Sequence, residues 1–178
     1  ETGLHRVAAG PATAPASPVT LAQEADSITL DNGLVRVVLA ASGPGPLRQV
    51  IAQGHAYLAD PGDLRFHVND ADTTHESSRR LEVLECSSVR VRVRIHGTHV
   101  CAAGNSSLNY RLDVELWAGW PVLRLDYHFF NLQPGRENVP IHAMGLAWNI
   151  ALDGPTERHF LQSSYGLFMI AREVTNPA

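Results

Sequence analysis

The sequence predicts an all-β domain, an antiparallel sandwich or barrel-like fold of roughly ten short strands. The first observation is the alternation of apolar and charged residues along 89–96, 108–117 and 122–131. Such alternation is typical of strands that are buried on one face only. The second is that Gly, Pro and Asn-Gly breakers separate short β-branched runs. The third is that no segment combines helical periodicity with helix caps.

The strands are predicted in chain order from these runs and breakers. The domain opens with a hairpin of 27–30 and 35–39, because the Asn32-Gly33 pair between them is suited to the positive φ angles of a tight turn. Later strands are bounded by turn residues on both sides. They are expected at 47–52, 64–69, 80–85, 89–96, 108–117, 122–131, 141–150, 158–162 and 167–170.

The register of one hairpin follows from its apolar pattern. A two-residue loop at 119–120 keeps the apolar faces of the flanking strands together, and this sets Glu115 opposite Arg124. The same register sets Asp113 opposite Asp126, a like-charge pair that needs neighbouring cations. If the arginine-bearing strand at 89–96 pairs on the other side, its guanidinium groups supply them.

Length and composition limit the classes of function. A chain of 178 residues is long enough for one well-buried domain and short for two. The net charge of −4 argues against nucleic-acid binding, and no apolar run approaches the ~20 residues of a membrane helix. All 14 basic residues are arginine, which excludes mechanisms that need a lysine. We expect no cofactor and no metal.

We expect residues 1–18 to lie outside the fold and residues 19–178 to form a single β domain. The opening Glu-Thr-Gly is similar to the remnant of a secretion vector, and 8–18 is an Ala/Pro-rich linker. This start predicts a secreted or extracellular protein. In such a protein the sequon at Asn105 would accept a glycan.

The two cysteines are expected to remain separate thiols. Cys86 and Cys101 flank the strand at 89–96. That strand spans roughly 26 Å at about 3.3 Å per residue, whereas a disulfide needs Cα atoms closer than about 7 Å. Only a chain that turns back after this strand would bring them together.

A row of arginines is the main candidate binding feature. Arg90, Arg92 and Arg94 share one strand face at intervals of about 6.6 Å, and could receive successive carboxylates of a uronic-acid chain. The same arginines could instead pair with acids on neighbouring strands as a charge zipper. The sequence favours the zipper, because cross-strand pairs of opposite charge are common. Trp120, at a hairpin tip, is the tryptophan expected to be exposed for stacking on a sugar.

Other polar residues suggest chemistry less directly. The segment 67–76 gathers carboxylates and two imidazoles, but its spacing matches neither an EF-hand nor a zincin pattern, so a solvated polar loop is the better interpretation. His128, beside Asp126 on one strand face, and His142 are candidate acid/base groups. Neither carries a recognisable catalytic motif, and no nucleophile elbow occurs.

Several segments carry a resemblance to a known family. They are 28–39, 45–47, 89–97, 110–117 and 119–131, and the similarity spans about residues 27–150. They resemble the N-terminal β domain of exo-acting rhamnogalacturonan lyase-like proteins, which are polysaccharide lyase family 26 and its YetA-like relatives. The opening Asn-Gly-x-Val-x-Val-x-Leu phrase is also shared by mutarotase-like β domains.

In the proteins that this chain resembles, catalysis is associated with a helical toroid, for which the chain has no room. The resemblance therefore implies an accessory β domain of a pectin-degrading protein, with further domains on the same polypeptide and no catalytic residue carried over. The first hypothesis is thus a secreted, non-catalytic domain that assists recognition of an acidic polysaccharide, with no nucleic-acid or membrane partner. The alternatives are a sugar-active sandwich enzyme, lyase or mutarotase-like, and a structural or protein-interaction domain.

Overall fold

The computed structural model describes residues 17–58, 64–69, 71–76, 78–132, 140–141, 143–149, 157–164 and 168–175, all of them in strands and connections. The strands are β1 (Thr20–Gln23), β2 (Ser27–Asp31), β3 (Val35–Ala40), β4 (Leu47–Ala52), β5 (His55–Leu58), β6 (Leu64–Val68), β7 (Ala71–Asp72), β8 (Arg80–Cys86), β9 (Arg90–Val100), β10 (Ser106–Trp117), β11 (Leu123–Phe130), β12 (Met144–Trp148), β13 (Glu157–Ser164) and β14 (Phe168–Thr175). The predicted all-β class is confirmed. Within the described ranges there is no helix with the length and apolar character needed to span a membrane.

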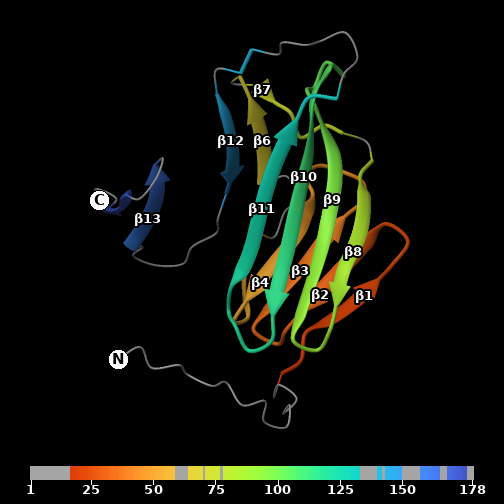
Figure 1. Cartoon of the computed structure of the whole chain (residues 1–178), viewed down its shortest axis with the longest axis vertical. Coiled ribbons are helices and arrows are strands. Elements are labelled where there is room, and N and C mark those ends of the chain that lie inside the picture. The colour runs from red at the N-terminus through yellow and green to blue at the C-terminus, as the bar shows by residue number, and fades with distance from the viewer. Residues whose placement is uncertain are drawn as a thin grey trace, which may run out of the picture.

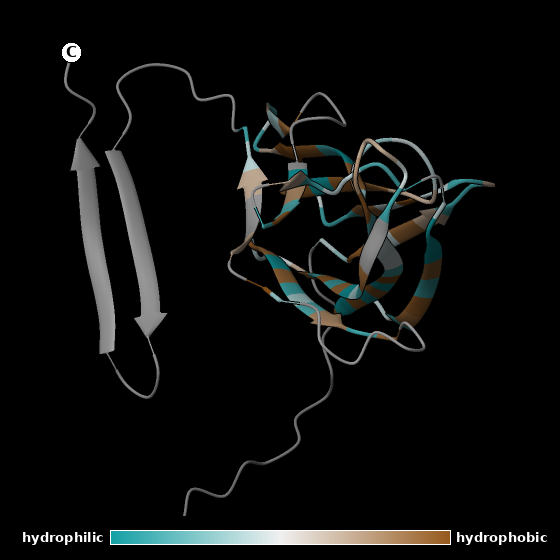
Figure 2. Ribbon diagram, turned by 90° about the horizontal axis from the view of Figure 1, so that it is seen from above, coloured by the Kyte–Doolittle hydropathy of each residue, from teal (hydrophilic) through white to brown (hydrophobic). Residues whose placement is uncertain are grey.

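Two antiparallel sheets form the layers of a sandwich. One has the order β1-β2-β3-β4-β5 and the other β11-β10-β9-β8, with the second in front of the first in Figure 1. A smaller sheet, β12-β6-β7, lies at one end of the layers, and β13 pairs with β14. Teal and brown bands alternate along the strands in Figure 2, as expected for sheets with one apolar face.

The core lies between the two layers. Val91, Val93 and Ile95 of β9 are fully buried, and so are the apolar residues at alternate positions of β10. They pack in one cluster with the inward residues of the opposite sheet, including Leu30 and Val37. Each fully buried aliphatic side chain contributes roughly 1.5–3 kcal/mol, so this cluster fixes which face of each strand points outward.

The predicted register around Gly119 is confirmed. Asp113 lies opposite Asp126, and Glu115 lies opposite Arg124. On its other side β10 pairs with β9, as the arginine-bearing strand was expected to do. The connection itself is longer than predicted, because β10 ends at Trp117 and β11 begins at Leu123, which leaves 118–122 as a loop.

The turn between β2 and β3 differs from the prediction. Only Gly33 has a positive φ, 79°, so the turn does not use Asn32 as a second left-handed residue. Asn32 is instead fully buried, and its side-chain oxygen accepts hydrogen bonds from the backbone N–H groups of Leu34 and Val35 at 3.0 and 2.7 Å. The Asn therefore stabilises the turn through its side chain.

The amide nitrogen of Asn32 joins the two layers. It donates to the carbonyl oxygens of Trp117 and Trp120, each at 2.7 Å. These two residues bracket the start of the 118–122 loop, which belongs to the opposite sheet. Pro121 in that loop has no N–H for a ladder bond, which limits the extension of the hairpin. These two hydrogen bonds, called the Asn32 latch below, therefore shape the hairpin tip that carries Trp120.

Three short strands were not predicted: β1, β5 and β7. β5 follows a tight turn in which Gln53 and Gly54 both have positive φ, 52° and 79°. That conformation matches the hairpin twist, but Gln is a weak signal for it in a sequence. The predicted strand at 141–150 is shorter than expected, since β12 covers Met144–Trp148.

The segment expected to be a solvated polar loop is partly buried instead. Glu76 accepts hydrogen bonds from the Arg79 guanidinium and from the Tyr110 hydroxyl, and the backbone N–H of Thr98 donates to it at 2.6 Å. Arg79 also donates to the carbonyl oxygen of Gly43 at 2.8 Å. This cluster ties the segment before β8 to the sandwich, so that interpretation of the sequence was wrong for Glu76.

Two features of the strands concern single positions. Cys86 and Cys101 are both free, as expected. Gly97 of β9 lies against the Tyr110 ring, and a Cβ at this glycine would come within 2.4 Å of the ring carbon Cζ. The glycine is therefore required by the close approach of the ring rather than by a turn.

Candidate functional site

The polar face of the β8–β11 sheet, called the outer face below, holds most of the charged residues singled out in the sequence. Strand alternation directs them away from the core. The cross-strand register places six arginines and five carboxylates on this face. They are Arg80, Arg90, Arg92, Arg94, Arg111, Arg124, Glu82, Glu85, Asp113, Glu115 and Asp126.

The centre of the outer face is an ion-paired ladder. Arg94 donates to Asp113 through Nε at 2.7 Å and through Nη2 at 2.9 Å. Arg92 donates to the same carboxylate at 2.5 Å, and its Nε lies 3.0 Å from Glu115. The last contact is close but not aligned as a hydrogen bond. The structure thus shows the charge zipper that the sequence favoured.

The ladder is layered rather than flat. The side chains of Asp113 and Glu115 are only 1% and 5% exposed, whereas those of Arg92 and Arg94 are 32% and 22% exposed. The guanidinium groups therefore cover the carboxylates. Hydrogen bonds from Arg94, followed by those from Arg92, hold the pKa of Asp113 at about 2, so this carboxylate is ionised across the neutral range.

Exposed pairs border the ladder. Arg90 pairs with Glu85, whose hydrogen bond lowers the pKa of that carboxyl. On the same side of the sheet His96 lies 2.9 Å from Glu82 and 2.7 Å from Arg80. These pairs are open to water, where each contributes at most about 1 kcal/mol.

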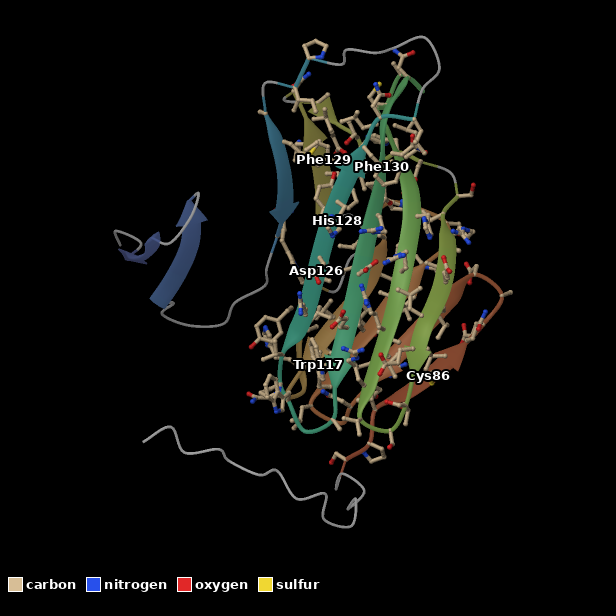
Figure 3. All side chains as sticks on the ribbon, in the orientation of Figure 1. Cys86, Trp117, Asp126, His128, Phe129 and Phe130 are labelled. Atoms are coloured by element: carbon tan, nitrogen blue, oxygen red, sulfur yellow. The ribbon has the colours of Figure 1, made fainter. Side chains whose placement is uncertain are left out.

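The β11 side of the outer face is different. His128 lies directly opposite Arg111 in the register, and Figure 3 shows it on β11 between Asp126 and Phe130. Asp126, which shares this strand face with His128, forms its ion pair with Arg124 at 2.9 Å. His142, the other acid/base candidate, lies outside the described residues.

Arg111 was not singled out in the sequence. It lies on β10 between His96 and His128, and its Nε is buried without a hydrogen-bond partner. The predicted register already placed position 111 opposite position 128, with no acid at either. The signal in the sequence is therefore an arginine placed opposite a histidine rather than opposite an acid.

Trp120 is exposed, as expected, with 62% of its surface accessible. Its ring lies 6.3 Å from that of Trp117 at a tilt of 42°. Leu34 and Val122 are exposed apolar residues in the turn and the loop that the Asn32 latch joins. This end of the sandwich therefore presents apolar and aromatic surface beside the outer face.

Asn105 is exposed in the connection between β9 and β10. The backbone there closes on itself, since the N–H of Cys101 donates to the carbonyl oxygen of Asn105 at 3.0 Å. Its side chain is thus accessible at the opposite end of β10 from Trp120.

Residues 19–171 match the family described as PcRGLX-like protein central beta sandwich domain. A comparison with curated proteins returned no match. The family's description places the sandwich centrally, which corrects the N-terminal position implied by the resemblance. The sequence thus predicted the rhamnogalacturonan lyase-like family, and the match over most of the chain shows that the chain belongs to the PcRGLX-like family as its central β-sandwich domain.

Proposed function

We propose that this sandwich is a secreted, non-catalytic domain that helps a rhamnogalacturonan lyase-like protein to recognise its acidic polysaccharide through the outer face. The observation that carries the proposal is the layering of that face. Its guanidinium groups lie above carboxylates that are almost fully buried. A ligand that approaches from solvent would meet the cations first.

A guanidinium that pairs with one carboxylate still has N–H donors for another acceptor. Arginine has five N–H donors, and Arg94 uses those of Nε and Nη2 on Asp113. The remaining donors can contact a second acceptor, and bidentate contact with a carboxylate is the preferred geometry. The zipper and the platform are therefore compatible, because the buried acids orient the guanidinium groups that a ligand would contact.

The balance of charge supports the same surface. The whole chain has a net charge of −4, but the outer face holds six arginines and five carboxylates. The polyanion would thus be favoured on this face relative to the rest of the molecule. Trp120, at the end of the same sheet, adds an exposed ring on which a sugar could stack.

The accessory role and the secretion belong to the same proposal. A family defined by a central sandwich is consistent with catalysis in a neighbouring domain. His128 and His142 are the acid/base groups of the competing hypothesis, in which the sandwich itself acts on sugars. The exposed position of Asn105 supports the secretory route, because a glycan on this sequon would not disturb the core.

The test is calorimetric titration with rhamnogalacturonan oligosaccharides at low and moderate salt, alongside absorbance of unsaturated uronate. Binding that weakens with salt, with no new absorbance, is the expected result. New absorbance would contradict the non-catalytic role. No binding heat and no new absorbance would together favour a structural or protein-interaction domain.

A matched pair of variants locates the binding. Arg90→Gln removes a guanidinium whose carboxylate partner is exposed, so the fold should survive and the affinity should fall. Arg36→Gln removes an exposed arginine from β3 of the opposite sheet, beside an open depression that also contacts Ile51 and Gln53. We expect no change for Arg36→Gln. The reverse result would move the binding site to that depression.

A further inference from the structure

We propose that Arg111 and His128 form the seat for a carboxylate group of the polysaccharide, at the β11 side of the outer face. This inference rests on the proposed function and sharpens it to one position. The arginines of the outer face are not all paired with acids. The described structure gives a carboxylate partner to five of them, namely Arg80, Arg90, Arg92, Arg94 and Arg124.

Arg111 is the sixth, and it has no ion pair or hydrogen bond within the described part of the chain. Its Nε is buried without a partner. A buried donor that is left unsatisfied is costly, and native proteins satisfy the great majority of such groups. The Arg111 guanidinium is therefore not neutralised by any carboxylate of the described chain, and its Nη donors, which are not among the buried unpaired atoms, can meet an acceptor from outside.

The cross-strand neighbours of Arg111 make the imbalance stronger. On one side lies His96, whose ring nitrogen is already engaged by Glu82 and Arg80. On the other side lies His128, which is exposed and has no hydrogen-bond partner among the described residues. Directly opposite residues in a sheet have Cβ atoms about 4.5–5.5 Å apart, so one anion can contact both side chains.

The next position on the same face suggests what kind of anion fits. Phe130 follows His128 at i+2 on β11, and Figure 3 shows both along the same strand. Its half-buried ring offers apolar surface beside the two nitrogen-bearing side chains. A uronate combines a carboxylate for the guanidinium with a sugar face for the ring, whereas an inorganic anion lacks the second part.

The ion-paired ladder adjoins the seat and determines how a bound polysaccharide would run across the face. Asp113 lies next to Arg111 on the same face of β10 and is held by Arg92 and Arg94. A carboxylate bound at Arg111 would thus not compete with Asp113 for Arg92 or Arg94. It would add a bound anion on the β11 side of these arginines. The seat and the ladder together would contact successive uronates of one chain.

The experiment compares Arg111→Gln with the matched control Arg36→Gln, which lies on the opposite sheet. Affinity is measured for a galacturonate-containing oligosaccharide and for its carboxyl-reduced form. We expect Arg111→Gln to weaken binding of the charged ligand by about 10- to 100-fold, as for loss of a charge-assisted hydrogen bond. Binding of the reduced ligand should be unchanged, and Arg36→Gln should behave as the parent. Thermal midpoints and amide spectra show whether each variant is folded.

The possible results separate this inference from the proposed function. If Arg90→Gln weakens binding but Arg111→Gln does not, the outer face is the recognition surface and the seat is wrong. If the parent binds neither oligosaccharide, the proposed function fails. The seat is then judged by the ¹⁵N resonance of the Arg111 side chain during titration with galacturonic acid.

That resonance is assigned by its loss in Arg111→Gln. A shift with galacturonic acid that exceeds the shift with inorganic phosphate would support the seat on its own. No shift would overturn it, and an equal response to phosphate would overturn its preference for a uronate. His128→Gln should reduce the galacturonic acid response, because it removes the second contact.

Discussion

The chain builds two arginine–carboxylate networks that differ in depth. In the inner network, Glu76 and Arg79 are enclosed at 5% and 0% side-chain exposure, and Tyr110 closes it from β10. In the outer network, Asp113 is equally buried, but Arg92 and Arg94 remain partly open to water. The same two kinds of side chain thus serve as an internal clamp in one place and as a surface layer in the other.

The pKa values of the two acids shift in opposite directions. Burial raises the pKa of Glu76, and this outweighs the opposing effects of Arg79 and of the hydrogen bonds to the carboxylate. For Asp113, hydrogen bonds from Arg94 and Arg92 outweigh burial and hold the pKa at about 2. Two guanidinium groups at an open face therefore favour the charged form more than one enclosed guanidinium does.

The difference gives each network its own response to acid. Folding favours protonation of Glu76, so the stability linked to that protonation is fully present below the ordinary pKa of 4.5 and is lost as pH rises through the raised value. The contribution of Asp113 is present above its ordinary pKa of 3.8 and is lost as pH falls toward about 2. The enclosed network therefore favours the neutral form of its acid, whereas the outer network keeps its acid ionised.

The largest effect is expected from breaking the inner network. Glu76→Gln leaves the enclosed Arg79 guanidinium without a counter-charge, which should lower the free energy of unfolding by about 3–5 kcal/mol. Urea denaturation followed by tryptophan fluorescence measures it. A loss below about 1 kcal/mol would mean that the two networks do not differ in the way their burial implies.

The packing around Tyr110 should be the next most sensitive. Gly97→Ala places a Cβ within 2.4 Å of the ring carbon Cζ, and we expect a loss of about 2–3 kcal/mol in unfolding free energy from this overpacking. The same substitution in a Tyr110→Leu background should cost much less. Equal costs in both backgrounds would show that the ring is not the obstacle.

Acid titration tests the outer network. The folded pKa of Asp113 lies about 1.8 below its ordinary value of 3.8, so about 2 kcal/mol of stability should disappear between pH 4 and pH 2. Asp113→Asn should lack this part of the loss, although it is less stable than the parent near pH 6. Parallel stability curves for the two proteins would contradict the shift. Unfolding by urea at intervals of pH supplies the curves.

The smallest effect is expected at the rim. Glu82→Gln removes an exposed carboxylate that contacts His96 and Arg80, and it should change the unfolding free energy by less than about 1 kcal/mol. It is the matched control for Glu76→Gln, since the substitution is identical and only the depth differs. Similar losses for the two variants would remove the contrast between rim and interior.

The fold and the outer ladder were largely predictable because strand alternation and the apolar core determine register. Setting the inward residues of β10 and β11 together was enough to place Asp113 opposite Asp126 and Glu115 opposite Arg124. The family was predictable as well, from sequence segments that include the turn at Asn32.

What the sequence did not reveal depends on contacts between distant segments. The burial of Glu76 requires Arg79 and Tyr110 to converge, and no local pattern distinguishes that from a solvated loop. The short strands β1 and β5 lack a periodic signal because they have only four residues each. The register placed Arg111 opposite His128, but only the partners of the neighbouring arginines show that its guanidinium stays unpaired among the described residues.

The Asn32 latch has a consequence for the order of folding. Its turn forms from neighbouring residues, but its bonds to the carbonyls of Trp117 and Trp120 span 85 and 88 residues of chain. Closing so long a loop requires both sheets to be in place, so these bonds belong to the late stage of folding. Trp120 fluorescence should consequently change after the strands have formed, and Asn32→Ala should speed unfolding more than it slows refolding.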